Sequence, residues 1–274
     1  MNNKVVISIL GCGWLGLALS KTLISEKFVV KGSTTSSLKM KVLSDAGVEP
    51  YLVHFNKENV SKNLIKFLTC DILIIAVPPG RNNIDRNENY RQLVSEVKQQ
   101  IPNSIKKIIL ISSTSVYAET NLEVNENSPL SNLPTAKVLL DAEYEFKKLV
   151  NTKLIILRLS GLIGPERHPS RFFAGKSEIP DGLAPVNLVH QTDVINLILE
   201  VLQNDNADGT YNVSSPSHPT RQEFYTKAAS IAGLKIPQFV HEKKNWKIIN
   251  SFRLKNELKF SFKVGDLMKW LDSE

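Results

Sequence analysis

Three glycines near the start of the chain place the strongest constraint on its fold. Gly11, Gly13 and Gly16 lie between an apolar run at 5–10 and a segment with helical character. The first glycine permits a tight turn, the second leaves space beside the backbone, and the third lets a helix pack closely on a strand. A strand, a glycine-rich turn and a helix in this order are typical of the start of a doubly wound domain. This stretch therefore predicts a turn whose amides, with the helix N-terminus behind them, bind the diphosphate of a dinucleotide.

The length and composition are those of an ordinary globular protein. The chain has 274 residues, 42% of them hydrophobic and 22% charged, which allows one large core or a core with a smaller domain. Its two cysteines, Cys12 and Cys70, argue for a reducing compartment rather than a disulfide framework. The apolar run after Lys4 is interrupted by glycines, lacks a cleavage site and is too short to span a bilayer. We therefore expect a cytoplasmic protein with no membrane partner.

The formal net charge of +7 favours anionic small-molecule ligands. The lysines are scattered or occur in isolated pairs such as Lys106 and Lys107, and no basic stripe is interleaved with aromatic residues. This distribution argues against nucleic acid as a partner. The five histidines lie far apart without ligand spacing, so no metal site is predicted.

Apolar segments of strand length alternate with helical segments over the first 160 residues. The segments predicted as strands are 5–10, 28–33, 51–55, 71–77, 107–112 and 153–159, and the longest predicted helices are 89–101 and 134–150. This alternation predicts the α/β class, with a Rossmann-type doubly wound parallel sheet covered by helices on both faces. We expect a dinucleotide-binding domain at 1–160 and a smaller substrate lobe at 161–274, with a strand and helix near 186–214 returning to the main domain.

Ligands of such sheets bind beyond the C-terminal ends of the strands. We therefore predict cofactor contacts from residues that form the glycine turn or follow a strand. These are Gly11, Cys12, Gly13, Trp14, Leu15, Gly16, Ser33, Thr34, Thr35, Ala76, Val77, Pro78 and Ser112.

The cofactor prediction depends on an acidic residue that is missing. Proteins that prefer NAD place a carboxylate about 20 positions after the first glycine, where it binds the ribose hydroxyls. Here Lys31 falls at that distance, and the window 29–35 contains hydroxyl side chains but no Asp or Glu, with Lys39 close behind. A site of this kind suits a 2′-phosphate and predicts NADP, with NAD as the alternative. The other interpretation is that these serines and threonines cap the following helix.

The regular alternation ends at a long irregular stretch, 164–185. Long ordered loops are usually functional, so we expect this stretch to shape the substrate side of the protein. Arg167 and Arg171 lie in it and are suited to hold an acidic or phosphorylated substrate. The alternative is that both are solvated loop charges.

Several ordered motifs together resemble those of a known superfamily. They are the glycine turn, Ser112–Tyr117 (SSTSVY), Leu157–Pro165 (LRLSGLIGP), Asn187–Val194 (NLVHQTDV) and Gly209–Val213 (GTYNV). The chain resembles the atypical extended short-chain dehydrogenase/reductases of the NAD-dependent epimerase/dehydratase superfamily. Its short glycine motif is most similar to that of the YeeZ-type group.

This resemblance implies roles for individual residues. Ser113 matches the family's serine or threonine that hydrogen-bonds the substrate oxygen. Arg158 matches an arginine on the ribose side of the cofactor, although an arginine there also suits a simple ion pair with a carboxylate. His190 and Asp193 match loop and cap residues on the substrate side, and Asp193 is also suited to cap its helix.

The family's acid/base pair, Tyr-x-x-x-Lys, is not found where the resemblance places it. If Lys137 is taken as the lysine, Leu133 stands in the tyrosine position. If the alignment is anchored on Glu143, Thr135 and Leu139 take the two positions.

Two other tyrosines are candidates for the missing tyrosine of this pair. Tyr144 and Lys148 have the right spacing, but only fourteen residues separate Tyr144 from Arg158, too few for the usual helix and turn. Tyr117 lies just beyond the same predicted strand end as Ser113 and is a candidate substitute acid.

The sequence therefore favours an NAD(P)-dependent oxidoreductase, or an epimerase/dehydratase-like enzyme, of unknown substrate. The alternative is a non-catalytic NADP-binding sensor. The family resemblance alone implies a homodimer through the helices near 89–101 and 134–150.

Overall fold

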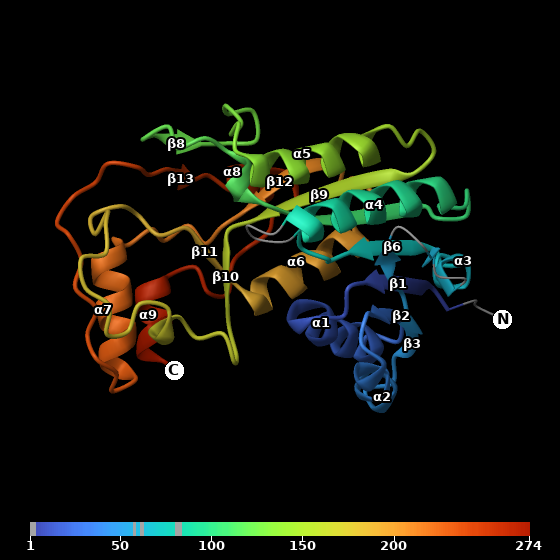
Figure 1. Cartoon of the computed structure of the whole chain (residues 1–274), viewed down its shortest axis with the longest axis horizontal. Coiled ribbons are helices and arrows are strands. Elements are labelled where there is room, and N and C mark those ends of the chain that lie inside the picture. Colours follow the sequence, from blue (N-terminus) through green and yellow to red (C-terminus); the bar gives the residue numbers. More distant parts are fainter. Residues whose placement is uncertain (1–3, 57–58, 61–62, 80–83) are drawn as a thin grey trace. The chain divides into compact units, whose positions relative to one another are not determined.

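The apolar runs of the sequence form the strands of one seven-stranded sheet. The computed structural model describes residues 4–56, 59–60, 63–79 and 84–274. The sheet has the order β12-β9-β7-β6-β1-β2-β3 (Figure 1). Its strands are β1 (Val6–Leu10), β2 (Val29–Thr34), β3 (Glu49–Leu52), β6 (Ile72–Ile75), β7 (Lys107–Ser113), β9 (Lys153–Leu159) and β12 (Gly209–Val213). The neighbours from β7 to β3 pair in parallel. The predicted fold class, a Rossmann-type doubly wound parallel sheet, is confirmed.

The chain divides into two units, which are described separately. Unit 1 comprises Met1–Val116, Asn132–Leu157 and Asp208–Thr210, and unit 2 comprises Tyr117–Ser131, Arg158–Ala207 and Tyr211–Glu274. The main change of unit along the chain thus falls within β9, three residues before the expected boundary at residue 160. The segment 117–131, which the sequence placed in the first domain, groups with unit 2.

The helices of unit 1 cover the sheet. They are α1 (Trp14–Ser25), α2 (Ser37–Asp45), α3 (Asn63–Phe67), α4 (Ile84–Gln100) and α5 (Pro134–Lys147). Helix α1 packs on β1 and β2, and α2 packs on β2 and β3. Helices α4 and α5 lie side by side (Figure 1). A short 3-10 turn, η1 (Thr114–Val116), follows β7, and the two-residue strands β4 (Phe55–Asn56) and β5 (Asn59–Val60) form a small antiparallel ladder.

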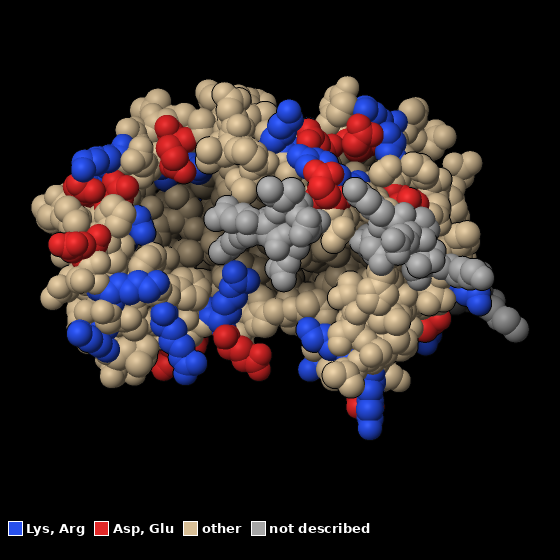
Figure 2. Space-filling view, viewed as in Figure 1, with Lys and Arg blue, Asp and Glu red and all other residues tan. Residues whose placement is uncertain are grey.

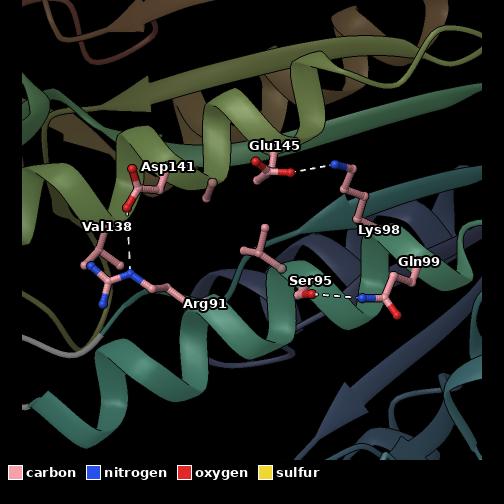
Figure 3. A pocket seen from close by; sticks show the side chains of 9 residues that line it. Arg91, Ser95, Lys98, Gln99, Val138, Asp141 and Glu145 are labelled. Carbon is pink, nitrogen blue, oxygen red and sulfur yellow. Dashed lines mark hydrogen bonds and ion pairs between the residues drawn. The ribbon is translucent and has the colours of Figure 1, made fainter.

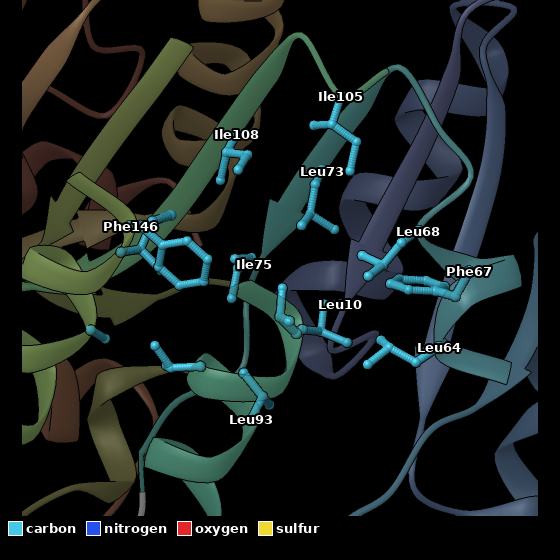
Figure 4. Close-up of a cluster of buried hydrophobic side chains, with 14 of the residues drawn as sticks. Leu10, Leu64, Phe67, Leu68, Leu73, Ile75, Leu93, Ile105, Ile108 and Phe146 are labelled. Carbon is cyan, nitrogen blue, oxygen red and sulfur yellow. The ribbon is translucent and has the colours of Figure 1, made fainter. Parts of the chain in front are cut away.

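One large apolar cluster joins the strands to α3, α4 and α5 (Figure 4). Every second residue of a strand contributes to this cluster, because successive side chains point to opposite faces of a sheet. Leu73 and Ile75 of β6 and Ile108 of β7 thus face the cluster. Phe67 and Phe146, both fully buried, bring α3 and α5 into it. Burial of so many apolar side chains stabilises the sheet and thereby holds the ends of its strands in place.

Unit 2 is built from short elements around its own apolar cluster. Its elements are β8 (Glu123–Val124), β10 (Gly161–Ile163), η2 (Pro169–Arg171), β11 (Leu188–His190), α6 (Gln191–Gln203), α7 (Arg221–Ile231), β13 (Ile248–Ile249), α8 (Phe252–Glu257) and α9 (Leu267–Asp272). The cluster includes Phe224 of α7 and Trp270 of α9. Helix α7 begins with a capping box, in which the side chains of Thr220 and Glu223 each accept a hydrogen bond from the other residue's amide.

The structure differs from the sequence analysis mainly at the ends of elements. The strand predicted at 51–55 begins two residues earlier, and Phe55 belongs to β4. Helix α4 begins at Ile84, whereas the sequence analysis predicted a start at 89. The prediction missed the first residues because most of them are polar and they show no apolar periodicity. In the ranges that the structure describes, no helix is long and apolar enough to cross a membrane.

Candidate functional site

The glycine turn of unit 1 is held by backbone contacts that only glycine permits. Gly11 has a φ of +99°, and its amide donates to the Ser33 hydroxyl at 2.8 Å. The Cys12 amide donates to the Ser33 carbonyl at 2.9 Å. A Cβ at Gly16 would collide with the Gly11 carbonyl oxygen, so α1 can approach the turn only with glycine there. The turn, α1 and the end of β2 are therefore fixed against one another.

Gly13 has a different role from the two glycines beside it. A Cβ at Gly13 would meet nothing within 4 Å, so this glycine borders open space. Gly13 is also the N-cap of α1, where no side chain caps the helix and no acidic residue lies in the first turn. The amides and the positive end of the helix dipole are consequently available to an anion above Gly13.

A cavity of about 640 Å³ opens beside this turn at the C-terminal edge of the sheet. Its volume is that of a site for a small molecule or cofactor. Nine predicted cofactor residues line it: Gly11, Cys12, Gly13, Ser33, Thr34, Thr35, Ala76, Val77 and Pro78. The other lining residues are Leu10, Lys39, Val53, His54, Pro79, Asn89, Tyr90 and Leu93. The strand ends are thus brought together as a parallel sheet requires.

The charge of this cavity is one-sided. Lys39 and His54 line it and both are exposed, and there is no Asp or Glu among the lining residues that the structure describes. Neither side chain has a hydrogen-bond or ion-pair partner among the residues that the structure describes. Burial raises the pKa of the Cys12 thiol to about 11 and also raises the pKa of the Tyr90 phenol, so both stay neutral near pH 7. The cavity therefore favours an anionic ligand.

The hydroxyl side chains after β2 do not cap the helix that follows. Ser36 is the N-cap of α2, yet its side chain accepts no hydrogen bond from the first turn, which also lacks an acidic residue. The Thr34 hydroxyl bonds the Ser36 amide, and exposed Thr35 lines the cavity. Lys31 points elsewhere, because its ammonium donates to the carbonyls at the end of α3. The capping interpretation of this window is thus not supported.

Five predicted cofactor residues do not line the cavity. Trp14, Leu15 and Gly16 form the first turn of α1, and Gly16 serves packing. Ser112 is buried, and its hydroxyl donates to the Glu143 carboxylate of α5 at 2.6 Å. Arg158 belongs to unit 2 and is 4% exposed, with a partner described below.

Ser113 ends β7, one residue after the buried Ser112. It is half-buried, and its hydroxyl accepts a hydrogen bond from the Ser115 amide at 3.2 Å. Strand β6 pairs with both β1 and β7, with Ile75 opposite Leu10 and Leu110. Ser113 therefore leaves the sheet at the same edge as the glycine turn.

Tyr117 takes part in a buried polar network of unit 2. The side chain is 1% exposed, and its hydroxyl donates to Asn212 Oδ1 and accepts from Arg158 Nη1, both at 2.7 Å. The Arg158 guanidinium also lies 5.0 Å from the centre of the phenol ring. Burial raises the pKa of Tyr117, against the influence of Arg158. A phenol held in this way is poorly suited to release a proton, so we leave Tyr117 out of the proposed chemistry.

The tyrosine-lysine pair on α5 lies on the surface. Tyr144 is 63% exposed, and the Lys148 ammonium lies 4.1 Å from the centre of its ring. The pair therefore forms an exposed cation–π contact. Of the residues that the two alignments place in the family positions, Leu133 is 64% exposed and Leu139 is 6% exposed.

The predicted substrate-side residues all fall in unit 2. Arg167 and Arg171 are exposed in the irregular stretch. His190 is instead 7% exposed; it caps α6 by accepting from the Thr192 amide, and its ring lies 5.3 Å from that of Trp270. Burial lowers the pKa of His190, so the imidazole is neutral at neutral pH. This geometry supports a packing and capping role for His190.

A second cavity of unit 1 lies between α4 and α5 (Figure 3). Ion pairs bridge the two helices there, from Lys98 to Glu145 at 2.5 Å and from Arg91 to Asp141 at 3.7 Å. Whether a second copy of the chain covers these helices stays a prediction. On the face shown in Figure 2, the Lys and Arg side chains of the described residues are interspersed with Asp and Glu.

The sequence analysis missed part of the cavity wall. His54 lies two residues after the end of β3, but the sequence analysis placed it inside the strand predicted at 51–55 and so did not count it among the residues that follow a strand. Asn89, Tyr90 and Leu93 come from α4, and no local pattern distinguishes them from the rest of that helix.

The Tyr117 network gives a testable prediction. Tyr117→Phe leaves a buried Arg158 N–H and Asn212 Oδ1 without this partner, so we expect the free energy of unfolding to fall by about 1–3 kcal/mol in urea denaturation. Tyr144→Phe, at an exposed position, is the matched control and should change it by less than about 0.5 kcal/mol. Equal stability of both variants and wild type would show that the network contributes nothing.

Comparison with known proteins places the chain in a family. No family model matches it. Protein YeeZ of Escherichia coli K12 is 38% identical over 266 residues, which cover 95% of this chain and 96% of that protein.

Solved structures agree in fold. UDP-glucuronic acid 4-epimerase from Bacillus cereus, in complex with NAD, has a TM-score of 0.80 at 19% identity, covering 98% of this chain and 97% of that one. A short-chain dehydrogenase/reductase superfamily protein from Agrobacterium tumefaciens with bound NAD has a TM-score of 0.79 at 17% identity, covering 98% and 95%. A conserved protein of unknown function from Silicibacter pomeroyi has a TM-score of 0.78 at 20% identity, covering 98% of both chains.

The identity to protein YeeZ over nearly the full length of both chains leads to one assignment: the chain belongs to the family of protein YeeZ.

Proposed function

We propose that this protein is an NADP(H)-dependent oxidoreductase or epimerase/dehydratase-like enzyme that binds its cofactor in the cavity beside the glycine turn. One observation carries the proposal. The cavity combines an uncapped helix N-terminus over Gly13 with Lys39 and His54, and its described lining residues include no carboxylate. Two structurally similar proteins carry bound NAD, which supports a dinucleotide as the ligand class.

The residues of the cavity fit the parts of a dinucleotide. The open space over Gly13 receives the diphosphate, where the α1 amides and helix dipole offset its charge. Val77 and Pro78 follow β6 and form an apolar wall. When bound, the cofactor supplies or accepts a hydride.

The preference for NADP over NAD rests on the residues after β2. The ribose 2′ position of a dinucleotide lies near the end of this strand. Thr35 offers a hydroxyl there and Lys39 a cation, while the uncapped α2 N-terminus adds a partial positive charge. A 2′-phosphate gains from all three, and the window 29–35 contains no carboxylate that would select ribose hydroxyls.

Ser113 is the proposed catalytic contact to the substrate. Its hydroxyl lies at the C-terminal edge of the sheet and can donate a hydrogen bond to a substrate oxygen while accepting from Ser115. A fixed donor aimed at an oxygen that gains negative charge lowers the barrier to hydride transfer. Arg167 and Arg171 remain proposed contacts for an acidic substrate.

A non-catalytic NADP-binding sensor is the second candidate. The specific observation in its favour is that Tyr117 is buried and Tyr144 lies on the surface, while neither alignment of the family motif supplies both the tyrosine and the lysine. No phenol-lysine acid/base pair is then available at the family position.

A substitution at Gly13 tests the binding site. Gly13→Val places a branched side chain in the open space over α1, so affinity for both NADPH and NADH should fall by at least about tenfold in fluorescence titrations. Because a Cβ meets nothing within 4 Å there and φ is −77°, the variant should stay folded, which thermal unfolding checks. Unchanged affinity for both dinucleotides would remove the cavity from the proposal.

Cofactor preference is tested at Lys39. Lys39→Met removes the cation, so NADPH affinity should fall about tenfold while NADH affinity stays the same. Lys41→Met lies on the same helix, is exposed and does not line the cavity, and therefore serves as the matched control. An equal loss for both cofactors would contradict recognition of the 2′-phosphate.

Catalysis is tested by a screen of carbonyl and nucleotide-sugar substrates with NADPH in excess. Ser113→Ala should reduce turnover by about a hundredfold and leave NADPH affinity unchanged, because its contact is made to the substrate. Ser115→Ala, exposed two residues on, is the control. Full turnover by Ser113→Ala would remove the proposed contact. Tight NADPH binding without turnover on any substrate would instead favour the sensor.

A further inference from the structure

A pocket of about 350 Å³ lies on unit 2, and its lining residues all belong to that unit. Its volume is at the small end of the range for ligand sites, about 300–1,000 Å³. The lining residues come from two segments, 125–127 and 250–257, and four of the eight are asparagines. We refer to it as the amide pocket.

The strand register brings the two sides of the amide pocket together. Strands β8 and β13 pair in parallel (Figure 1), with Val124 opposite Ile249, and the Asn250 amide donates to the Val124 carbonyl at 2.9 Å. The residues that follow the two strands, Asn125 and Asn250, therefore leave this small ladder at the same end. The loop after β8 supplies one side of the pocket and α8 supplies the other.

Hydrogen bonds between side chains and backbone hold both sides in place. In the loop after β8, Asn125 Oδ1 accepts from the Asn127 amide at 3.0 Å, and the Asn125 amide donates to Ser128 Oγ at 2.9 Å. At the start of α8, Asn250 Oδ1 accepts from the Phe252 amide at 2.6 Å. The pocket is thus formed before a ligand enters, so binding requires little ordering of the protein.

The charged residues of the amide pocket are already engaged. Arg253 Nε donates to Glu257 Oε1 at 2.7 Å, and the Tyr211 hydroxyl donates to Glu257 Oε2 at 3.2 Å. Glu126 Oε1 accepts from the Asn212 amide at 2.7 Å. The hydrogen bond from Arg253 lowers the pKa of the Glu257 carboxyl, which stays ionised near pH 7. Two carboxylates and one guanidinium make the pocket unfavourable for anionic ligands.

The groups that remain open to a ligand are amides and one aromatic ring. The side chains of Asn127 and Asn256 are exposed and have no hydrogen-bond partner in the part of the chain that the structure describes. Phe252 is 62% exposed and lines the same pocket. A carboxamide both donates and accepts, as do the neighbouring hydroxyls of a sugar ring. An aromatic face beside them suits the C–H groups on the apolar side of such a ring.

We propose that the amide pocket binds a neutral pyranose sugar, with Asn127 and Asn256 on its hydroxyls and Phe252 against its apolar face. An apolar ligand would leave the amides desolvated and unpaired. An anionic ligand would be repelled by Glu126 and Glu257. An extended peptide rises about 3.3 Å per residue and would need a longer groove.

The inference is independent of the proposed cofactor. None of the described residues that line the amide pocket also lines the cavity beside the glycine turn. The two sites can therefore be tested separately in the same protein.

The experiment titrates the full chain with the methyl glycosides of glucose, galactose, mannose and N-acetylglucosamine, and follows binding by saturation-transfer NMR. We expect at least one to bind with a Kd of about a millimolar or tighter, as is reasonable for a ligand of about a dozen non-hydrogen atoms. Phe252→Ala and Asn256→Ala should each weaken this binding about five- to tenfold. Glucuronate and glucose 6-phosphate should bind at least about fivefold more weakly than the neutral glycosides.

Two variants in the same unit serve as matched controls. Leu122→Ala removes an apolar side chain that is 64% exposed, and Asn245→Ala removes an exposed amide, and neither residue lines the pocket. Both should bind the glycosides as wild type does. Because all four substitutions are at exposed positions, thermal unfolding should show them folded. The affinity for NADPH should equal that of wild type in every variant.

Four results would overturn the inference. If none of the four glycosides binds wild type, the amide pocket is not a sugar site. If a glycoside binds but Phe252→Ala and Asn256→Ala match wild type, the sugar binds elsewhere. If glucuronate or glucose 6-phosphate binds more tightly than the neutral glycosides, the charge argument is wrong. If an uncharged alanine peptide displaces the glycoside and binds more tightly, the pocket accepts a protein segment instead.

Discussion

The contact between α1 and the glycine turn is the constraint on which the rest of unit 1 depends. Gly16 leaves no room for a side chain against the Gly11 carbonyl, and the Gly11 amide in turn reaches the Ser33 hydroxyl. A Cβ at Gly32 would lie 2.7 Å from the Cys12 sulfur, so β2 approaches the turn equally closely. These contacts join β1, α1 and β2 into one rigid corner. The cavity is the space that this corner leaves open, and its positive character follows from helix ends that no side chain caps.

Short-range features of the sequence were sufficient to predict part of the cavity. The glycine turn, the apolar strands and the residues that directly follow them are short-range features, and a parallel sheet brings such strand ends together whatever the rest of the chain does. Nine cavity residues follow from this rule. His54 was missed because the strand was predicted to extend over 51–55, whereas β3 ends at Leu52.

Residues whose roles depend on distant partners could not be predicted in this way. Tyr117 stands next to a strand end, but Asn212, 95 positions further on, takes up its hydroxyl. Ser112 has the same position in its motif as a cofactor contact, yet it turns toward Glu143 of α5. His190 packs on Trp270, 80 positions away in the sequence, and belongs to the interior of unit 2. In each case a long-range hydrogen bond or ring contact decides the role, and the spacing of residues along the chain carries no sign of it.

The buried Asn212 also determines how β12 can lie in the sheet. Within unit 2 its amide donates to Glu126, its Nδ2 donates to the Asn250 carbonyl and its Oδ1 accepts from Tyr117. A strand at the border of a sheet has a ladder on one side only, and a slip by one residue would turn every side chain to the opposite face. Such a slip would break all three of these bonds at once. Side-chain chemistry thus locks this outermost strand in a single alignment, a task that backbone pairing on both sides performs for strands in the interior.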